Sequence, residues 1–251
     1  MPEIISFHAF RRGAGTSSLT ASVAALLAVQ GYRVGVVDAD LQSPSAHILF
    51  GLENIDIYHT LTDYLQDKCA IEQAVYDVTP NLGTPISGQI FLVPGSSDPL
   101  KIMHILRHGY EVTALTDVFA KLVQDYSLNY LLLDVTAGIT DESLASLAIA
   151  DVLVLVLRLD QQGYQGTGVL LEGARKMRAA RMFFVVNDVP AIYNLEDTSA
   201  RVAQTYGISP DFVIPHADEM LALASTGIFS LRYPEHTVTK ILSELTARLI
   251  G

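Results

Sequence analysis

The fold of this chain is constrained most by a repeated alternation between short apolar runs and segments with helical periodicity. The apolar runs are continuous and lie at 4–7, 33–37, 89–93, 130–133, 152–157, 182–186 and 212–214. Continuous runs of this length are typical of strands that are buried on both faces of a parallel sheet. The helical segments between them lie at 17–30, 115–126, 141–149, 168–180, 198–206 and 220–226. This pattern predicts an α/β fold, a single doubly wound and mostly parallel sheet with helices on both faces.

Length and charge limit the classes of function. The 251 residues are within what one hydrophobic core supports, so we expect a single domain over 1–251. Acidic residues outnumber basic ones by 27 to 16, and a surface of that sign repels nucleic-acid phosphates and anionic lipid. The single cysteine, Cys69, excludes an internal disulfide and a cysteine zinc cluster. No export signal or apolar stretch of membrane-spanning length is present, so a cytoplasmic protein is expected, with no direct membrane binding and with nucleic-acid binding disfavoured.

Polar residues gather directly after the predicted strands, at 8–18, 38–45, 134–142, 187–190 and 215–219. In an open α/β sheet, ligands bind at the edge that the carboxyl ends of the strands form. The sequence therefore predicts a functional site at this edge. Elsewhere, the stretch 77–89 is predicted to be a surface loop. The segment 236–250 is predicted to be an amphipathic helix that packs on the core, since without large aromatic residues it is a poor membrane anchor.

A glycine-rich loop follows the first predicted strand and opens the first helix, with the sequence Arg11-Arg12-Gly13-Ala14-Gly15-Thr16-Ser17-Ser18. Small residues in this context expose successive backbone N–H groups, and the helix N-terminus adds positive potential, so the loop suits phosphate binding. Ser17 stands where P-loop proteins coordinate Mg²⁺. The complete motif has lysine directly before that hydroxyl, where this chain has Thr16. Taken alone, the loop is also compatible with a tight strand-to-helix turn that has serine at the N-cap.

Other segments accompany this loop in a recognisable order. They are GVVDADLQSP at 35–44, LVPGS at 92–96, LLLD at 131–134 with Ala137-Gly138 after it, Asn187, and Ile214-Pro215 before Asp218-Glu219. In this order and spacing, the chain resembles the MinD/ParA family of deviant Walker A ATPases over nearly its full length. The loop is most similar to that of the CpaE/TadZ branch, whose members also tend to lack the Walker lysine. The resemblance implies a P-loop NTPase fold and an ATP-binding switch protein that positions or assembles cellular machinery.

The same resemblance implies which residues bind ATP and Mg²⁺. Those implied for the nucleotide are Arg11, Arg12, Gly13, Ala14, Gly15, Thr16, Ser17, Ser18, Asn187 and Pro215. Backbone amides of the loop would hold the phosphates, while Asn187 and the backbone near Pro215 would hold the adenine edge. Asp40 would be the catalytic residue, because it would orient the attacking water.

Three residues are implied at the metal. Ser17 would bind Mg²⁺, Asp38 would support its water shell, and Asp134 would be the Walker B carboxylate behind it. Taken alone, Asp38 and Asp134 are also compatible with helix capping or with solvation of a strand end.

The chain departs from the family pattern at the cations that contact phosphate. Thr16 replaces the Walker lysine, and Arg11 replaces the signature lysine that reaches across a dimer. Arg12 replaces a glycine, and the carboxylate that usually pairs with the signature lysine falls at about Gly166. Arg11 or Arg12 could supply the missing charge, because guanidinium binds phosphate bidentately. Alternatively, both are solvated on a loop that no longer binds nucleotide.

The sequence leaves three functions open. The first is an ATP-dependent switch with slow or absent hydrolysis, at most a weak ATP-dependent homodimer, which acts through an unknown protein partner. The second is a pseudo-ATPase scaffold that binds its partner without using nucleotide. The third is a metabolic P-loop enzyme, which Thr16 disfavours because such enzymes need the phosphate lysine.

Two further groups are interpreted as parts of the surface. The basic cluster Arg175, Lys176, Arg178 and Arg181 suits the C-terminus of a helix, with nonspecific DNA contact as the alternative. His104 and His108 are four residues apart, but no carboxylate lies between them in a zinc-protease pattern, so a surface pair is expected.

Overall fold

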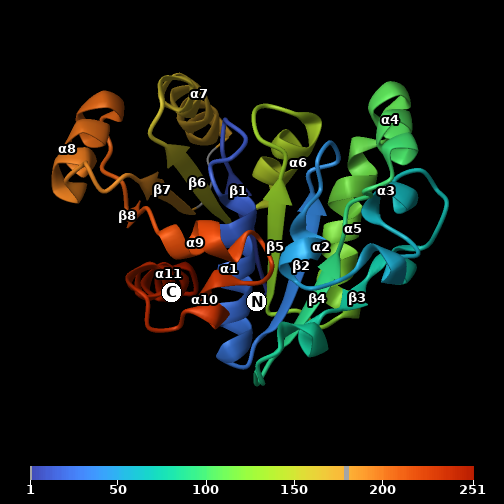
Figure 1. The fold of residues 1–251 in the computed structure, drawn as a ribbon. Coiled ribbons are helices and arrows are strands. Elements are labelled where there is room, and N and C mark those ends of the chain that lie inside the picture. Colours follow the sequence, from blue (N-terminus) through green and yellow to red (C-terminus); the bar gives the residue numbers. More distant parts are fainter. Residues whose placement is uncertain (1, 178–180) are drawn as a thin grey trace.

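The computed structural model describes residues 2–177 and 181–251, which form an eight-stranded sheet with helices on both faces (Figure 1). The strands are β1 (Glu3–His8), β2 (Arg33–Ala39), β3 (Tyr76–Asp77), β4 (Gln89–Val93), β5 (Tyr130–Val135), β6 (Val152–Arg158), β7 (Arg181–Val189) and β8 (Phe212–Pro215). Their order in the sheet is β3-β4-β2-β5-β1-β6-β7-β8. All neighbours pair in parallel except β3, which is antiparallel to β4.

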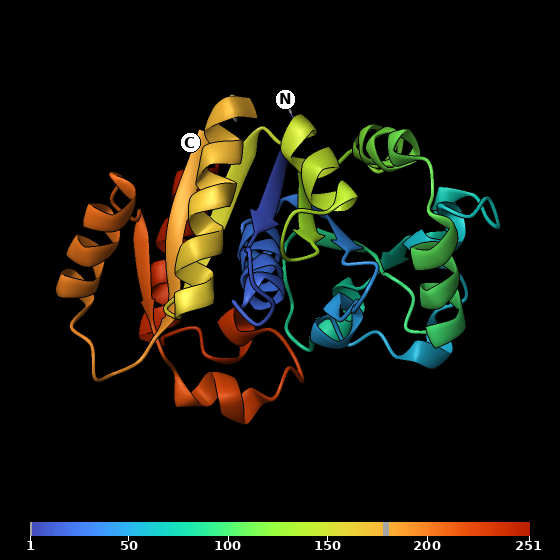
Figure 2. The same ribbon diagram turned by 90° about the horizontal axis from the view of Figure 1, so that it is seen from above.

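The helices divide between the two faces. They are α1 (Thr16–Val29), α2 (Ala46–Leu49), α3 (Leu61–Tyr64), α4 (Pro99–His108), α5 (Val112–Asp125), α6 (Asp141–Ile149), α7 (Gln161–Met177), α8 (Leu195–Tyr206), α9 (Asp218–Leu223), α10 (Phe229–Arg232) and α11 (Thr237–Leu249). Three short 3₁₀ helices add to them, η1 (Asn54–Asp56), η2 (Ile71–Ala74) and η3 (Thr79–Leu82). Helices α1, α10 and α11 share one apolar core with the sheet, while α5, α6 and α7 pack on the other face. Figure 2 shows α7 and α9 on opposite sides of the sheet.

The sheet brings the carboxyl ends of its central strands together. In Figure 1 the arrows of β2 and β5 point to the top of the view. Asp38 on β2 is the register partner of Asp134 on β5, and Phe7 on β1 is the partner of Asp134 on the other side. The loop after β1 therefore starts next to both strand-end aspartates.

The predicted fold class is confirmed, and the differences are local. Helices α2, α3 and α10 are four residues long, which is too short for a helical period to show in the sequence. Helix α4 was not predicted because large apolar side chains such as Leu100 and Met103 are exposed on it. The segment 77–89, predicted as a surface loop, contains η3, and Val78 within it is fully buried.

Two predicted helices also change their bounds. Helix α7 begins at Gln161 rather than at 168, since glycines at its start obscure the apolar periodicity, and the predicted residues 178–180 lie outside the described part. The C-terminal segment forms α11 and packs on the core as predicted. None of the described helices combines the length and apolarity that a membrane crossing requires.

Candidate functional site

The loop between β1 and α1 needs glycine at two positions. Gly13 and Gly15 have φ angles of 77° and 90°, in the left-handed region that side chains with Cβ disfavour. A Cβ on Gly15 would overlap the side-chain amide of Asn187. That amide donates a hydrogen bond of 2.8 Å to the Ala14 carbonyl, so the loop is held against the end of β7. The backbone conformation of the loop therefore requires glycine at positions 13 and 15.

Helix α1 opens directly from this loop with its amide groups available. Gly15 occupies the N-cap and carries no side chain that could accept from the first turn, and that turn contains no acidic residue. The first N–H groups of a helix have no partner within the helix, and the helix dipole places positive potential there. This end of α1 is therefore suited to an anion.

A cavity of about 360 Å³ lies over this helix end. It is lined by Arg12, Gly13, Gly15, Thr16, Ser17, Ser18, Asp40, Ser43, Ser45, Ile48, Leu49, Asp134, Val135, Ala137 and Ser225. Eight of these are residues that the sequence predicted for the site: Arg12, Gly13, Gly15, Thr16, Ser17, Ser18, Asp40 and Asp134. The structure thus brings together the loop, the hydroxyl at 17 and two of the three aspartates. Arg11, Ala14, Asp38, Asn187 and Pro215 do not line the cavity.

Two buried carboxylates, those of Asp134 and Asp38, lie at or next to the cavity. Asp134 is only 3% exposed and lines the cavity together with Ser17. Asp38 is fully buried and accepts from the backbone amides of Ser45 (2.8 Å) and Ala46 (2.9 Å), at the start of α2. Asp38 thus makes the helix-start contact that the sequence left open as an alternative to a metal role.

The electrostatics of this pair favour a nearby cation. Burial raises the pKa of Asp38 to about 7, and the charge of Asp40 adds to the effect. Burial, followed by the charge of Asp38, also raises the pKa of Asp134 well above its usual range. A divalent cation beside Ser17 would favour the charged carboxylates, and a hydroxyl with a carboxylate behind it is the oxygen donor set that Mg²⁺ prefers. The residues present therefore fit Mg²⁺.

Arg12 reaches across the mouth of the cavity to Asp40. Its guanidinium donates to both carboxylate oxygens, at 3.1 and 3.2 Å, and to the side-chain oxygen of Gln42 at 3.3 Å. The hydroxyl of Thr136 donates to the same carboxylate at 3.1 Å. Asp40 is therefore held in place by the loop residue that replaces a glycine of the family pattern.

Arg11 points to a different place. It forms an ion pair with Asp160 and lines a second hollow of about 510 Å³ between the loop and α7, which Arg12 also borders. Gly166 lines the same hollow, and a Cβ at that position would overlap the ring of Phe10. The missing carboxylate at 166 thus has a steric reason, and Asp160 supplies an acidic partner within the chain.

Sequence reasoning missed a third arginine beside the loop. Arg158 ends β6, where its guanidinium donates to the Gly13 carbonyl at 3.1 Å and lies 3.5 Å from the carboxylate of Asp188. Asp188 is bonded in turn to the imidazole of His216 at 2.6 Å. A charged residue that closes an apolar run was the available signal, the same one that marked Asp134.

A family model described as an AAA domain, AAA_31, matches residues 2–183 of this chain. The chain belongs to this family of AAA domains.

Three curated relatives are similar in sequence. An uncharacterized ATP-binding protein of Methanocaldococcus jannaschii is 22% identical over 255 residues, covering 98% of this chain and 87% of the relative. The cytosolic Fe-S cluster assembly factor CFD1 of Yarrowia lipolytica is 33% identical over 134 residues, covering 53% and 41%. The flagellum site-determining protein YlxH of Helicobacter pylori is 26% identical over 158 residues, covering 63% and 49%. The chain spans less than half the length of the last two.

Solved structures share the fold of this AAA domain. The septum site-determining protein MinD of Pyrococcus horikoshii, complexed with Mg-ADP, superposes with a TM-score of 0.79 at 20% identity, covering 99% of this chain and 96% of that one. The MinC:MinD complex of Aquifex aeolicus gives 0.78 at 17%, covering 99% and 96%. Cobyrinic acid a,c-diamide synthase of Mycobacterium smegmatis, with a bound ATP analog and magnesium, gives 0.76 at 16%, covering 100% and 94%. This AAA domain therefore has the MinD-like P-loop fold.

The remaining predicted groups lie on the surface of the AAA domain. The rings of His104 and His108 on α4 lie with their centroids 4.3 Å apart and their planes tilted by 30°, and His104 also forms a hydrogen bond with Gln66. Within residues 2–177 and 181–251, no three His, Cys, Asp or Glu side chains form a group suited to a metal ion. A metal at the cavity would therefore need ligand oxygens or water in addition to protein groups.

The predicted basic cluster does not form one helix end. Arg175 and Lys176 lie in the last turn of α7. Arg181 instead starts β7, where it bonds to Glu3 and to the last carbonyls of α11, and Arg178 lies outside the described residues.

Proposed function

We propose that this protein is an ATP-binding switch of the MinD/ParA type that positions or assembles cellular machinery through a protein partner. The observation that carries the proposal is the cavity over α1. One hollow joins a glycine loop with free helix amides, a hydroxyl at 17, and the strand-end carboxylates Asp40 and Asp134. This combination suits the phosphates of a nucleotide together with Mg²⁺. The MinD bound to Mg-ADP shares the fold around it.

In this proposal Arg12 replaces the charge of the Walker lysine. Three guanidinium groups lie near the loop, those of Arg11, Arg12 and Arg158. Of these, Arg12 lines the cavity and also borders the hollow beside α7, whereas Arg11 lines only that hollow and Arg158 donates to the carbonyl of Gly13. A phosphate in the cavity would compete with Asp40 for the Arg12 guanidinium, which binds either anion bidentately.

The other residues have separate tasks. Ser17 would hold Mg²⁺ with Asp134 behind it, and bound Mg²⁺ would neutralise phosphate charge. Asp40, once released by Arg12, would orient the attacking water. Asn187 and the backbone near Pro215 would lie toward the adenine. We propose slow hydrolysis because Thr16 brings no charge to the phosphates and because Arg12 must leave Asp40 first.

Association is proposed to be weak and dependent on ATP. Arg11 would have to leave Asp160 in its own chain before it could reach a second copy. The MinC:MinD complex of Aquifex aeolicus supports a protein partner for this chain. The name of YlxH, a flagellum site-determining protein, supports a role in positioning.

The first test is direct binding. Calorimetry with ATP and Mg²⁺ is expected to give a single-site isotherm, and steady-state phosphate release is expected to be far below the roughly 10 s⁻¹ of a median enzyme. ADP and a magnesium-free titration serve as controls. An absence of heat at millimolar ATP·Mg²⁺ would support the pseudo-ATPase scaffold instead, and turnover of several per second would contradict slow hydrolysis.

A second prediction separates the two loop arginines. Arg12→Gln is expected to weaken ATP·Mg²⁺ binding by about tenfold, because a hydrogen bond between charged groups contributes roughly 1.5–3 kcal/mol and part of it replaces the bond to Asp40. Arg11→Gln is the matched control, because it removes the same charge from a residue of the loop that does not line the nucleotide cavity. In dilute solution, its affinity for ATP·Mg²⁺ should be nearly unchanged. Equal losses in both variants would mean that Arg12 has no special role at the phosphates.

A further inference from the structure

Strand β7 contains a bulge where it contacts the glycine-rich loop. The register between β7 and β8 shifts between Val186 and Val189, so the segment that holds Asn187 and Asp188 contains an extra residue. Asp188 has a left-handed φ of 58°. A bulge changes the direction of side chains, and a residue other than glycine keeps such a φ where surrounding contacts hold it, often at a functional site. The side chains of this bulge are therefore candidates for a functional role.

Two consecutive carbonyl groups of the loop are held from the side of this bulge. The Asn187 amide donates to the carbonyl of Ala14 at 2.8 Å. The guanidinium of Arg158, which is the register partner of Asn187, donates to the carbonyl of Gly13 at 3.1 Å. The C=O and N–H groups of a trans peptide point in opposite directions, so these bonds turn the N–H groups of Ala14 and Gly15 away from the bulge. The direction of the loop amides thus depends on two side chains outside the loop.

The Arg158 guanidinium is itself oriented by a carboxylate. It lies 3.5 Å from Asp188, whose other carboxylate oxygen bonds to the imidazole of His216 at 2.6 Å. The second ring nitrogen of His216 lies 3.2 Å from the carboxylate of Asp218. Because an ionised carboxylate only accepts hydrogen bonds, both ring nitrogens donate and the imidazole is charged. The hydrogen bond to Asp188 accordingly raises the pKa of His216. Asp188 is therefore held between two cations.

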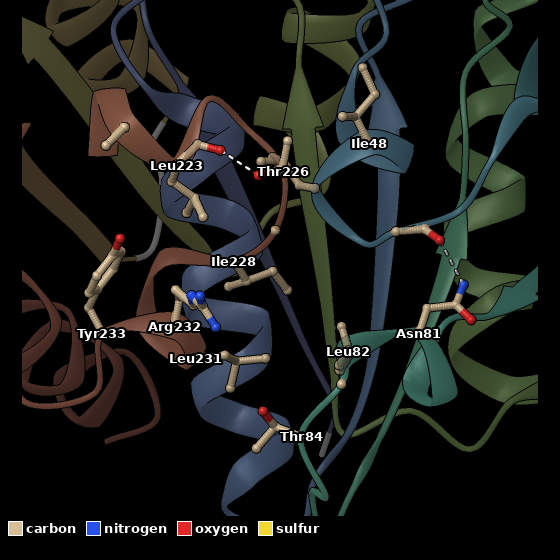
Figure 3. A pocket seen from close by; sticks show the side chains of 15 residues that line it. Ile48, Asn81, Leu82, Thr84, Leu223, Thr226, Ile228, Leu231, Arg232 and Tyr233 are labelled. Atoms are coloured by element: carbon tan, nitrogen blue, oxygen red, sulfur yellow. Dashed lines mark hydrogen bonds between the residues drawn. The ribbon is translucent and has the colours of Figure 1, made fainter. Parts of the chain in front are cut away.

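The contact between His216 and Asp218 extends these bonds to α9, which Asp218 opens. The turn after α9 is closed by a hydrogen bond of 2.6 Å from the Thr226 hydroxyl to the Leu223 carbonyl, shown in Figure 3. Ser225 in this turn lines the cavity over α1. The network therefore connects two walls of that cavity, the loop and the segment around α9.

We propose that Arg158, oriented by Asp188, is a positioning residue that holds the glycine-rich loop in its phosphate-binding conformation before a nucleotide arrives. The inference rests on the proposed ATP binding and adds a residue to it. Arg158 contacts a loop carbonyl, so it acts on affinity through the fraction of protein whose loop already has the binding conformation. The apparent affinity falls in proportion to that fraction.

The first test compares ¹⁵N relaxation in wild type and Arg158→Gln without nucleotide. The Arg158 side chain is 46% exposed, so the core should stay intact in this variant. The order parameter of the Ala14 amide, whose peptide Arg158 holds, is expected to fall from about 0.85 to about 0.6. The Gly15 amide, whose peptide Asn187 holds, should change less and serves as an internal reference.

The second test is calorimetry with ATP·Mg²⁺. Arg158→Gln is expected to weaken binding by about fivefold, and Asp188→Asn by about twofold, because the uncharged amide orients the guanidinium less firmly. Arg158→Lys keeps the charge and a donor, so it should recover most of the loss. Arg201→Gln is the control, since it removes the same charge from α8, where Arg201 stacks on Tyr193, and should behave like wild type.

The expected result is a less ordered Ala14 amide together with weaker ATP binding in Arg158→Gln, recovered in Arg158→Lys. The proposal is overturned if Arg158→Gln keeps the Ala14 amide as ordered as in wild type, if it binds ATP·Mg²⁺ like wild type, or if Arg158→Lys recovers nothing. Wild-type affinity in Asp188→Asn would overturn the orienting role of Asp188. A wild type that binds no ATP would refute the proposed function, whereas the relaxation measurement, made without nucleotide, would still decide whether Arg158 holds the loop.

Discussion

Gly15→Ala is expected to lower the affinity for ATP·Mg²⁺ by about a hundredfold, the effect of losing roughly 3 kcal/mol of hydrogen bonding between amides and phosphate. At a φ of 90°, alanine is strained, and its Cβ would overlap the amide of Asn187. Either the loop or Asn187 must move, and both movements displace the amides that open α1. Calorimetry with ATP·Mg²⁺ measures the loss.

The control for this variant is Gly207→Ala. Gly207 also has a left-handed φ, 69°, but a Cβ there would have no neighbour within 4 Å. It follows α8, far along the chain from the loop. Backbone strain alone should reduce thermal stability in both variants, whereas the loss of nucleotide should be confined to Gly15→Ala. Similar ATP affinities in the two variants would contradict a phosphate-binding role for the loop at 11–18.

Gly166→Ala is expected to destabilise the protein by about 1–3 kcal/mol, although alanine usually favours a helix over glycine. The reason is the ring of Phe10, which occupies the place where the Cβ would lie. For a chain of this size, the melting temperature should fall by about 2–4 °C per kcal/mol. Thermal unfolding followed by circular dichroism measures the change.

Gly173→Ala on the same helix provides the opposite case. A Cβ at Gly173 meets nothing within 4 Å, so the helix preference should act alone and raise stability by up to about 1 kcal/mol. The two variants are thus expected to differ in sign. If both stabilise the protein, Phe10 moves aside at little cost, and the glycine at 166 has another explanation.

The sequence alone was sufficient to predict the elements that a local residue pattern marks. Continuous apolar runs identified seven of the eight strands, because most of these runs are buried on both faces, with β4 and β8 as the exceptions. The missing strand, β3, consists of Tyr76 and Asp77 alone and exists only because β4 lies beside it. The loop at 11–18 and Asp134 were found for a similar reason, since each stands at a strand end that the pattern marks.

The sequence could not predict which side chains and backbone groups, far apart in the chain, form hydrogen bonds or ion pairs with one another. The sequence offers Arg11 and Arg12 as equivalent charges and does not show that Arg158 joins them, and only the fold decides which acceptor each one meets. Asp38 illustrates the same limit. The family resemblance implied a role in the water shell of the metal, and only the fold shows that its oxygens accept from the amides of Ser45 and Ala46, which the intervening turn brings back to it.

The two ends of the sheet have a consequence for how copies of the protein meet. At one edge, β3 is two residues long and runs against the direction of its neighbours. At the other, β8 is four residues long and closes on Pro215, which has no N–H to donate. Long unpaired edge strands invite strand-by-strand addition, the first step of many aggregates. The sheet edges among the described residues expose almost no such template, so edge-to-edge polymerisation is disfavoured and recognition between copies is left to side chains.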